Sequence, residues 1–399
     1  MQDRKVNYAA LKVANLGSMS GRGAADEVNL GSRTGLRMIL GQIARYGIVG
    51  AAIALLPLQQ QALAQAILPT GFLEMSTVPS NGDLNPYGVA FVPDGFPGGT
   101  LSPGDILVSN FNNSQNQQGT GSTIVRVKPD GTTSLFFQGT PPLGLTTALG
   151  VLKSGFVLVG NLPTNAGTLI PGEAGSILVI NRQGKQIGTL SDPNLLDGPW
   201  DLTILDQGNS AKVFVSNVLN GTVTRIDLAV RGSALGVTNK LTIAFGYAFR
   251  TDPAALVVGP TGLAYDAVRD ILYVASTGDN QIFKILHAGA TNMSVSKGTV
   301  VYQDNAHLRG PLALAFAPNG HLVTSNGDAV NPPPATPPPL PSQLVEFTIN
   351  GQFIGQLSVD PGPGAAFGLA FGQATNAMVR FAAVNDAINT IDVLTLNIP

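Results

Sequence analysis

A phrase of short apolar runs occurs six times along the chain and constrains its fold more than any other feature. In five copies the second run ends in Asn (Asn110, Asn161, Asn217, Asn326 and Asn385), and the fourth copy has Thr277 at the matching position. Consecutive positions are separated by 51, 56, 60, 49 and 59 residues. Short strand-like runs repeated at such a period are typical of a β-propeller, in which each repeat forms one blade.

The repeats predict an all-β fold, a six-bladed β-propeller with four-stranded antiparallel blades, over residues 65–399. The expected blades span about 85–139, 146–192, 197–247, 259–304, 308–360 and 364–396. The sixth copy contains only three runs, and the run over 71–79 has no blade of its own. We expect residues 71–79 to supply the missing strand of the last blade, because this closure hides a sheet edge.

The composition agrees with strands joined by many turns. The chain has 48 Gly and 28 Pro, and 12% of its residues are charged. Gly supplies positive φ angles in turns and Pro fixes φ near −65°, whereas a helical protein needs many Ala, Leu, Glu and Lys residues. The chain has no Cys, which excludes thiol catalysis, zinc–thiolate sites and iron–sulfur clusters.

Residues 1–64 do not follow the repeat. They contain 7 of the Lys and Arg residues, then an apolar run over 47–58 and the sequence Ala62-Leu63-Ala64. This order predicts a secretory signal peptide that is cleaved before Gln65, and therefore a secreted or periplasmic protein. The alternative is a single membrane anchor, but the run of about 12 residues is shorter than the ~20 needed to span a bilayer. Translation could also start at Met19 or Met38.

The charge of the remaining chain argues against nucleic acid as a partner. Residues 65–399 hold 15 of the 22 Lys and Arg residues and 21 of the 24 Asp and Glu residues, a net charge of −6. Phosphate binding needs clustered Lys and Arg side chains, and no such run is present.

Three motifs resemble those of a known family. The phrases are Pro-x-Gly-(Leu/Val)-Ala-(Phe/Tyr), as in 86–91 and 260–265, then Leu-(Tyr/Val)-Val-(Ser/Ala)-(Asn/Ser), then Gly-x-Ile-x-(Arg/Lys)-(Ile/Val). Over about 71–399 the chain resembles NHL-repeat propellers and is similar to the six-bladed group that contains regucalcin-type gluconolactonases. These propellers include hydrolases, lyases and binding scaffolds, so the resemblance implies the fold and no single activity.

The repeated Asn residues are expected around one mouth of the central channel. Long loops follow Asn110, Asn161 and Asn326, and loops gathered at one end of a rigid scaffold often carry function. The ligand-binding candidates are Asn110, Asn161, Trp200, Asp201, Asn217, Asn326 and Asn385. The alternative, favoured for any single Asn, is that the side chain bonds the backbone of its own turn. The alternative for Trp200 is a place in the core or a channel plug.

Asp197 is the candidate metal ligand. In gluconolactonase-like propellers a Glu-Gly-Pro-x-Trp phrase places a metal-binding carboxylate at the start of a first strand, and Asp197-Gly-Pro-Trp-Asp201 is similar. The resemblance implies a Ca²⁺ or other divalent cation site, with amide and carboxylate oxygens from Asn161, Asn217, Asp201 or Asn326. The acid here is Asp, and Trp200 comes one place early. A turn carboxylate is the alternative for Asp197.

The residues favour a non-catalytic binding protein and leave enzyme activity open. No spaced Ser/His/Asp set occurs, so no catalytic residue is assigned. We expect a monomer that binds a small ligand or a protein at the channel mouth. The alternatives are a metal-dependent lactonase or related hydrolase, and a scaffold that assembles through its outer blade surfaces. The proline-rich segment 332–341 could present a ligand to a partner, cover the mouth or be a rigid insertion.

Overall fold

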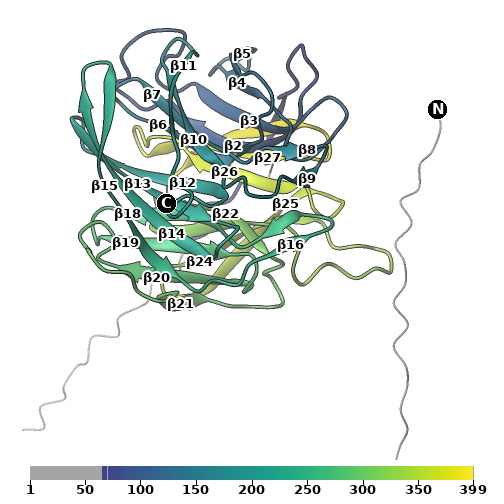
Figure 1. Cartoon of the computed structure of the whole chain (residues 1–399). Helices are drawn as coiled ribbons and strands as arrows, with labels where there is room; N and C mark the ends of the chain where they lie inside the picture. The colour runs from purple at the N-terminus through teal and green to yellow at the C-terminus, as the bar shows by residue number, and fades with distance from the viewer. Residues whose placement is uncertain (1–64, 70, 399) are drawn as a thin grey trace, which may run out of the picture. The chain divides into compact units, whose positions relative to one another are not determined.

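The computed structural model describes residues 65–69 and 71–398, and the predicted signal peptide over 1–64 lies outside them. The described chain forms six four-stranded antiparallel sheets and two short two-stranded sheets. The six larger sheets are arranged around a common centre (Figure 1). This part of the chain is therefore a six-bladed β-propeller, as predicted. It contains no helix that is long and apolar enough to cross a membrane.

Each blade runs outward from an innermost strand. Blade 1 contains β2 (Leu84–Phe91), β3 (Ile106–Asn112), β4 (Thr123–Val127) and β5 (Thr133–Gln138). Blade 2 contains β6 (Leu145–Val151), β7 (Phe156–Asn161), β10 (Ser176–Asn181) and β11 (Gln186–Leu190). Blade 3 contains β12 (Pro199–Asp206), β13 (Ser210–Asn217), β14 (Thr222–Arg231) and β15 (Ala234–Phe245).

The second half of the ring follows the same plan. Blade 4 contains β18 (Pro260–Asp266), β19 (Ile271–Ser276), β20 (Gln281–Leu286) and β21 (Thr299–Tyr302). Blade 5 contains β22 (Pro311–Phe316), β23 (His321–Asn326), β24 (Ser342–Thr348) and β25 (Phe353–Asp360). Blade 6 contains β26 (Ala366–Phe371), β27 (Met378–Asn385), β28 (Thr390–Asn397) and β1 (Leu73–Ser76). The short sheets pair β8 (Thr164–Asn165) with β9 (Thr168–Leu169) and β16 (Arg250–Asp252) with β17 (Leu256–Val258).

The N-terminal strand closes the ring as the sequence predicted. Strand β1 pairs antiparallel with β28, from Leu73 opposite Val393 to Ser76 opposite Thr390. One blade is thus built from both ends of the described chain, which covers the edge that β28 would otherwise expose.

The hydrophobic core lies between neighbouring blades. Six apolar clusters each join two adjacent blades, so the contacts continue around the whole ring. On β13, Val213 and Val215 belong to the cluster with blade 2, whereas Phe214 belongs to the cluster with blade 4. Successive side chains of a strand point to opposite faces, so a strand between two blades must be apolar at every position. Each such buried side chain contributes about 1.5–3 kcal/mol.

Every innermost strand carries a β-bulge near its start. In blade 3, Pro199 pairs with Asn217 and Leu202 pairs with Val215, so two residues, 200 and 201, lie opposite Ser216 alone. The backbone N–H of residue 201 leaves the ladder and donates to Ser216 Oγ at 3.1 Å. Ser216 Oγ in turn donates to the carbonyl oxygen of Thr261 in blade 4, at 2.7 Å. The bulge redirects two side chains and also joins two blades.

The second bulge position is crowded in the three blades that have Gly there. A Cβ added to Gly368 would lie 1.8 Å from the carbonyl oxygen of Tyr87, and one added to Gly262 would lie 2.4 Å from the backbone nitrogen of Leu314. Glycine is needed at both positions because the backbone of the neighbouring blade comes so close. This agrees with the small residues that the sequence places at the centre of the ring.

Candidate functional site

The first bulge residues help to fill one end of the central channel. An apolar cluster, called the plug below, consists of Tyr87, Phe111, Leu162, Trp200, Val218, Leu256, Val257 and Leu312, with Phe367 partly buried against it. The ring centroids of Phe111 and Trp200 lie 5.4 Å apart, and those of Tyr87 and Phe367 lie 4.8 Å apart. Trp200 is 1% exposed. The plug occupies the end of the channel where innermost strands begin and second strands end.

The repeated Asn side chains lie at the same end and are buried. The Oδ1 atoms of Asn161, Asn217 and Asn326 accept from the loops that lead into the innermost strands, whereas Asn385 accepts from its own turn, the alternative that the sequence favoured for any single Asn. The Oδ1 atom of Asn217 accepts from Asp197 N, that of Asn161 from Gly144 N, that of Asn326 from Arg309 N and that of Asn385 from Ala387 N. Asn110 Nδ2 donates to the carbonyl oxygen of Thr77, beside the closing strand. These five candidates therefore bond to the backbone of the ring.

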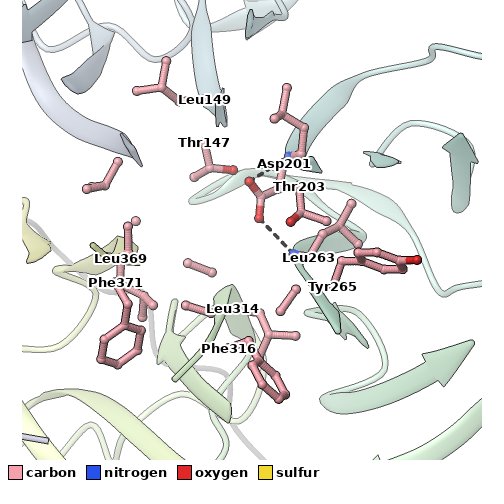
Figure 2. A pocket seen from close by; sticks show the side chains of 17 residues that line it. Thr147, Leu149, Asp201, Thr203, Leu263, Tyr265, Leu314, Phe316, Leu369 and Phe371 are labelled. Atoms are coloured by element: carbon pink, nitrogen blue, oxygen red, sulfur yellow. Dashed lines mark hydrogen bonds between the residues drawn. The ribbon is translucent and has the colours of Figure 1, made fainter. Parts of the chain in front are cut away.

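The other end of the channel contains a cavity of about 250 Å³. Residues of all six innermost strands line it, and Figure 2 shows ten of them labelled around the open space. The plug residues are not among the lining residues, whereas Tyr265, Phe316 and Phe371, from the ends of their strands, are. The cavity therefore lies on the side of the plug away from the repeated Asn residues.

Asp201 is the only carboxylate among the residues that line this cavity. It is the second bulge residue of blade 3. The matching residues are Gly88, Gly262, Ala313 and Gly368, and in blade 2, where residues 146–148 lie opposite Gly160, Thr147 is the one that lines the cavity. At this bulge position only blade 3 has a carboxyl group, whereas the other five blades have Gly, Ala or Thr.

Two backbone donors hold the Asp201 carboxyl group. Its Oδ1 atom accepts from Leu202 N at 2.8 Å, and its Oδ2 atom accepts from Leu263 N of blade 4 at 2.9 Å (Figure 2). Burial raises the pKa of Asp201 to about 8, although the two N–H donors favour the ionised form. Near neutral pH the group is therefore mostly protonated, and a neutral carboxyl can donate a hydrogen bond to a ligand.

Asp197 lies outside this cavity. It is half-buried, and burial raises the pKa of its carboxyl group. In the described part of the chain no group of three or more His, Cys, Asp or Glu residues is arranged to hold a metal ion. Both carboxyl oxygens of Asp201 and the Oδ1 atom of Asn217 already accept backbone N–H groups. The candidate donors do not fit a shared Ca²⁺ site, which needs six or more oxygens directed at one point.

The proline-rich segment is fixed at its base. The buried Arg309 guanidinium donates from Nε to Asp328 Oδ1 at 2.8 Å and from Nη2 to the carbonyl oxygen of Pro341 at 2.7 Å. The segment between these anchors is mostly exposed, and none of it lines the cavity.

Comparisons with known proteins find likeness at the level of the fold. No protein-family model and no curated protein matches the sequence. A luciferin-regenerating enzyme is 10% identical, with a TM-score of 0.49, over 82% of this chain and 95% of that one. The calcium-binding protein regucalcin from Agrobacterium tumefaciens is 12% identical, with a TM-score of 0.48, over 83% and 97%. A Thermus thermophilus protein described as a putative oxidoreductase (glucose dehydrogenase) is 12% identical, with a TM-score of 0.48, over 81% and 100%. The distant similarity to regucalcin-like propellers is thus observed, and the resemblance to NHL repeats stays a prediction.

The sequence predicted the ligand at the mouth surrounded by the repeated Asn residues, whereas the structure has the apolar plug at that end and the cavity at the other. The cavity-lining Leu149, Thr203 and Phe371 were not candidates, because nothing in a strand sequence tells which half of the strand faces empty space. The available signal was Asp201 itself, since it breaks the pattern of small residues at the second bulge position.

Proposed function

We propose that this protein is exported and binds a small ligand in the central cavity, with Asp201 as its main polar contact. The observation that carries the proposal is a single buried carboxyl group at a position where the other five blades have Gly, Ala or Thr. A buried ionisable group lowers the stability of the fold unless it is well paired, so its presence indicates a role other than packing. A strongly shifted pKa in a cavity is also typical of a functional site.

The cavity limits the ligand. Its volume of about 250 Å³ lies below the usual range for drug-sized ligands, roughly 300–1,000 Å³. A five- or six-membered ring compound is the size class that fits. Leu149, Leu369 and Phe371 supply apolar contacts, and Asp201 supplies the hydrogen bond. We therefore expect a small, uncharged, partly apolar ligand with a hydroxyl, carbonyl or ester oxygen.

The main alternative is a metal-dependent lactonase or related hydrolase. This alternative requires a carboxylate-held divalent cation to polarise a carbonyl group. Because the oxygens of Asp201 and the Asn residues are bonded to backbone N–H groups, we favour binding without turnover. A lactone is both a ligand of the expected class and the substrate that a lactonase would hydrolyse. One experiment with a lactone can therefore distinguish binding from hydrolysis.

The test titrates the mature protein with δ-valerolactone and with cyclohexanol, observed by saturation-transfer NMR, with and without CaCl₂. We expect both compounds to bind without hydrolysis. Asp201→Ala removes the carboxyl group that donates to the ligand and should weaken binding at least about tenfold, the loss expected for one buried hydrogen bond. The matched control is Asp197→Ala, which removes a half-buried carboxyl outside the cavity. Calcium-dependent hydrolysis would support the lactonase instead, and equal effects of the two variants would contradict the proposed site.

Export has its own test. The basic region, the apolar run and Ala62-Leu63-Ala64 support removal of residues 1–64. Mass spectrometry of the protein recovered outside the cytoplasm should give an N-terminus at Gln65. Recovery of the chain with residues 1–64 intact in the membrane fraction would favour the anchor.

A further inference from the structure

Residues 65–69, at the start of the described chain, pack against blade 5. Residues 65–69 belong to no strand. Ile67 N lies 3.1 Å from Glu346 Oε1 and 2.9 Å from Glu346 Oε2, and Leu68 N donates to Glu346 Oε2 at 3.2 Å. The Ile67 side chain is 4% exposed and packs in the apolar cluster between blades 5 and 6. Leu68 is partly buried against the same cluster. Side-chain hydrogen bonds and apolar packing therefore hold this segment, without any β-ladder.

The side chains of blade 5 that contact this segment bond to its backbone. Glu346 lies on β24 and is fully buried. Its Oε1 atom also contacts His321 Nδ1 at 2.6 Å and accepts from Asn319 Nδ2 at 3.2 Å. Asn319 Nδ2 also donates to the carbonyl oxygen of Gln65, at 3.3 Å. The carboxylate of Glu346 thus accepts from two consecutive backbone N–H groups, those of Ile67 and Leu68. The amide of Asn319 donates to the backbone carbonyl of Gln65, two residues before Ile67.

The buried carboxylate of Glu346 requires hydrogen-bond donors from a bound segment. A buried carboxylate is costly unless its oxygens accept hydrogen bonds. Loss of the segment would remove the Ile67 and Leu68 donors and would expose the apolar surface that Ile67 covers. The remaining partners, His321 and Asn319, come from the same blade and hold the carboxylate in place for the next occupant.

We propose that Glu346, His321 and Asn319 form a peptide-binding site whose resident occupant is the segment Gln65–Pro69. When the resident segment is removed, the site binds a short extended peptide in trans, provided that the peptide has two consecutive backbone N–H groups and an aliphatic side chain at the first of them. In the wild type the tethered segment competes at an effective concentration of about millimolar or higher, so a free peptide is excluded.

The experiment displaces residues 65–69 from Glu346 by substitution, in the otherwise intact chain. A double variant, Ile67→Pro with Leu68→Pro, removes both N–H donors. The probe is a fluorescent peptide with the sequence of residues 65–69 and an amidated C-terminus, measured by anisotropy. We expect it to bind the double variant at least about tenfold more tightly than the wild type, the gain from removing the tethered competitor. Adding Glu346→Gln should abolish this gain, and adding the exposed Glu173→Gln should not.

Two results would overturn the proposal: a folded double variant that does not bind the peptide, or an affinity that Glu346→Gln leaves unchanged. If the double variant does not fold, hydrogen exchange of the Ile67 and Leu68 amides decides. Glu346→Gln should accelerate their exchange at least about tenfold relative to the wild type, because a buried hydrogen bond to a charged group is lost. Unchanged exchange would show that Glu346 does not hold the segment.

Discussion

The two ends of the central channel are built by the same six innermost strands but are filled differently. At one end, side chains from several blades form the apolar plug around Trp200. At the other end the strands surround a cavity with Asp201 at its wall. The difference arises within two residues, because the bulge directs residue 200 to the plug and residue 201 to the cavity. The bulge, which recurs in every blade, stabilises the ring, whereas Asp201, the one carboxylate at the second bulge position, marks the candidate site.

The largest expected effect comes from breaking the plug. Trp200→Ala removes a fully buried side chain, and we expect it to lower the free energy of unfolding by about 3–5 kcal/mol. Phe371→Ala, at the cavity end, truncates a half-buried ring and should cost about half as much. Urea unfolding followed by far-UV circular dichroism measures both. Equal decreases in the free energy of unfolding would show that the two ends of the channel are packed equally tightly, which would contradict the difference between plug and cavity.

The second effect is a pH dependence confined to the cavity end. Burial raises the pKa of Asp201 from its ordinary value of 3.8 to about 8, so between these values the folded protein binds a proton that the unfolded chain releases. Its contribution to the free energy of unfolding is complete below about pH 4 and is lost as the pH rises to about 8, at about 1.4 kcal/mol per pH unit.

Asp201→Asn should flatten this dependence. We expect the difference in unfolding free energy between wild type and variant to change by a few kcal/mol between pH 5 and pH 8, in the direction that favours the variant at high pH. Chemical unfolding at four pH values measures it, with Asp197→Asn as the matched control. Parallel curves for the wild type and Asp201→Asn would mean that the carboxyl is ionised when folded.

The smallest effect concerns the repeated Asn residues. Asn217→Ala removes the amide that accepts from Asp197 N and donates to the carbonyl oxygen of Leu195, and should destabilise the protein by about 2 kcal/mol. Binding of cyclohexanol in the cavity should not change, and the exposed Asn209→Ala should change neither property. If Asn217→Ala abolished binding while leaving stability intact, the Asn end would have to be the ligand mouth.

The sequence predicted the ring and its closure because both follow from periodic burial. The spacing of the five Asn residues and Thr277 predicted six blades, and the run of residues before blade 1 with no blade of its own predicted the closing strand β1. The plug and the cavity could not be separated in this way, since Trp200 and Asp201 are neighbours in sequence and only the bulge sends them to different ends. The contact between Ile67 and Glu346 joins residues 279 positions apart, and no periodic pattern relates such distant positions.

The closing strand has a mechanical consequence. Because β1 and β28 are antiparallel, Leu73 at the start of β1 lies opposite Val393, on the side from which β28 continues to its end at Asn397. A force that pulls the two chain ends apart would load the hydrogen bonds of this pair one after another, as in unzipping, instead of all together. The load would first reach residues 65–69 and their contact with Glu346. Force spectroscopy on the protein held by its two ends should therefore show blade 6 opening in small early steps before the remaining blades unfold, and a single rupture of the whole ring would contradict this order.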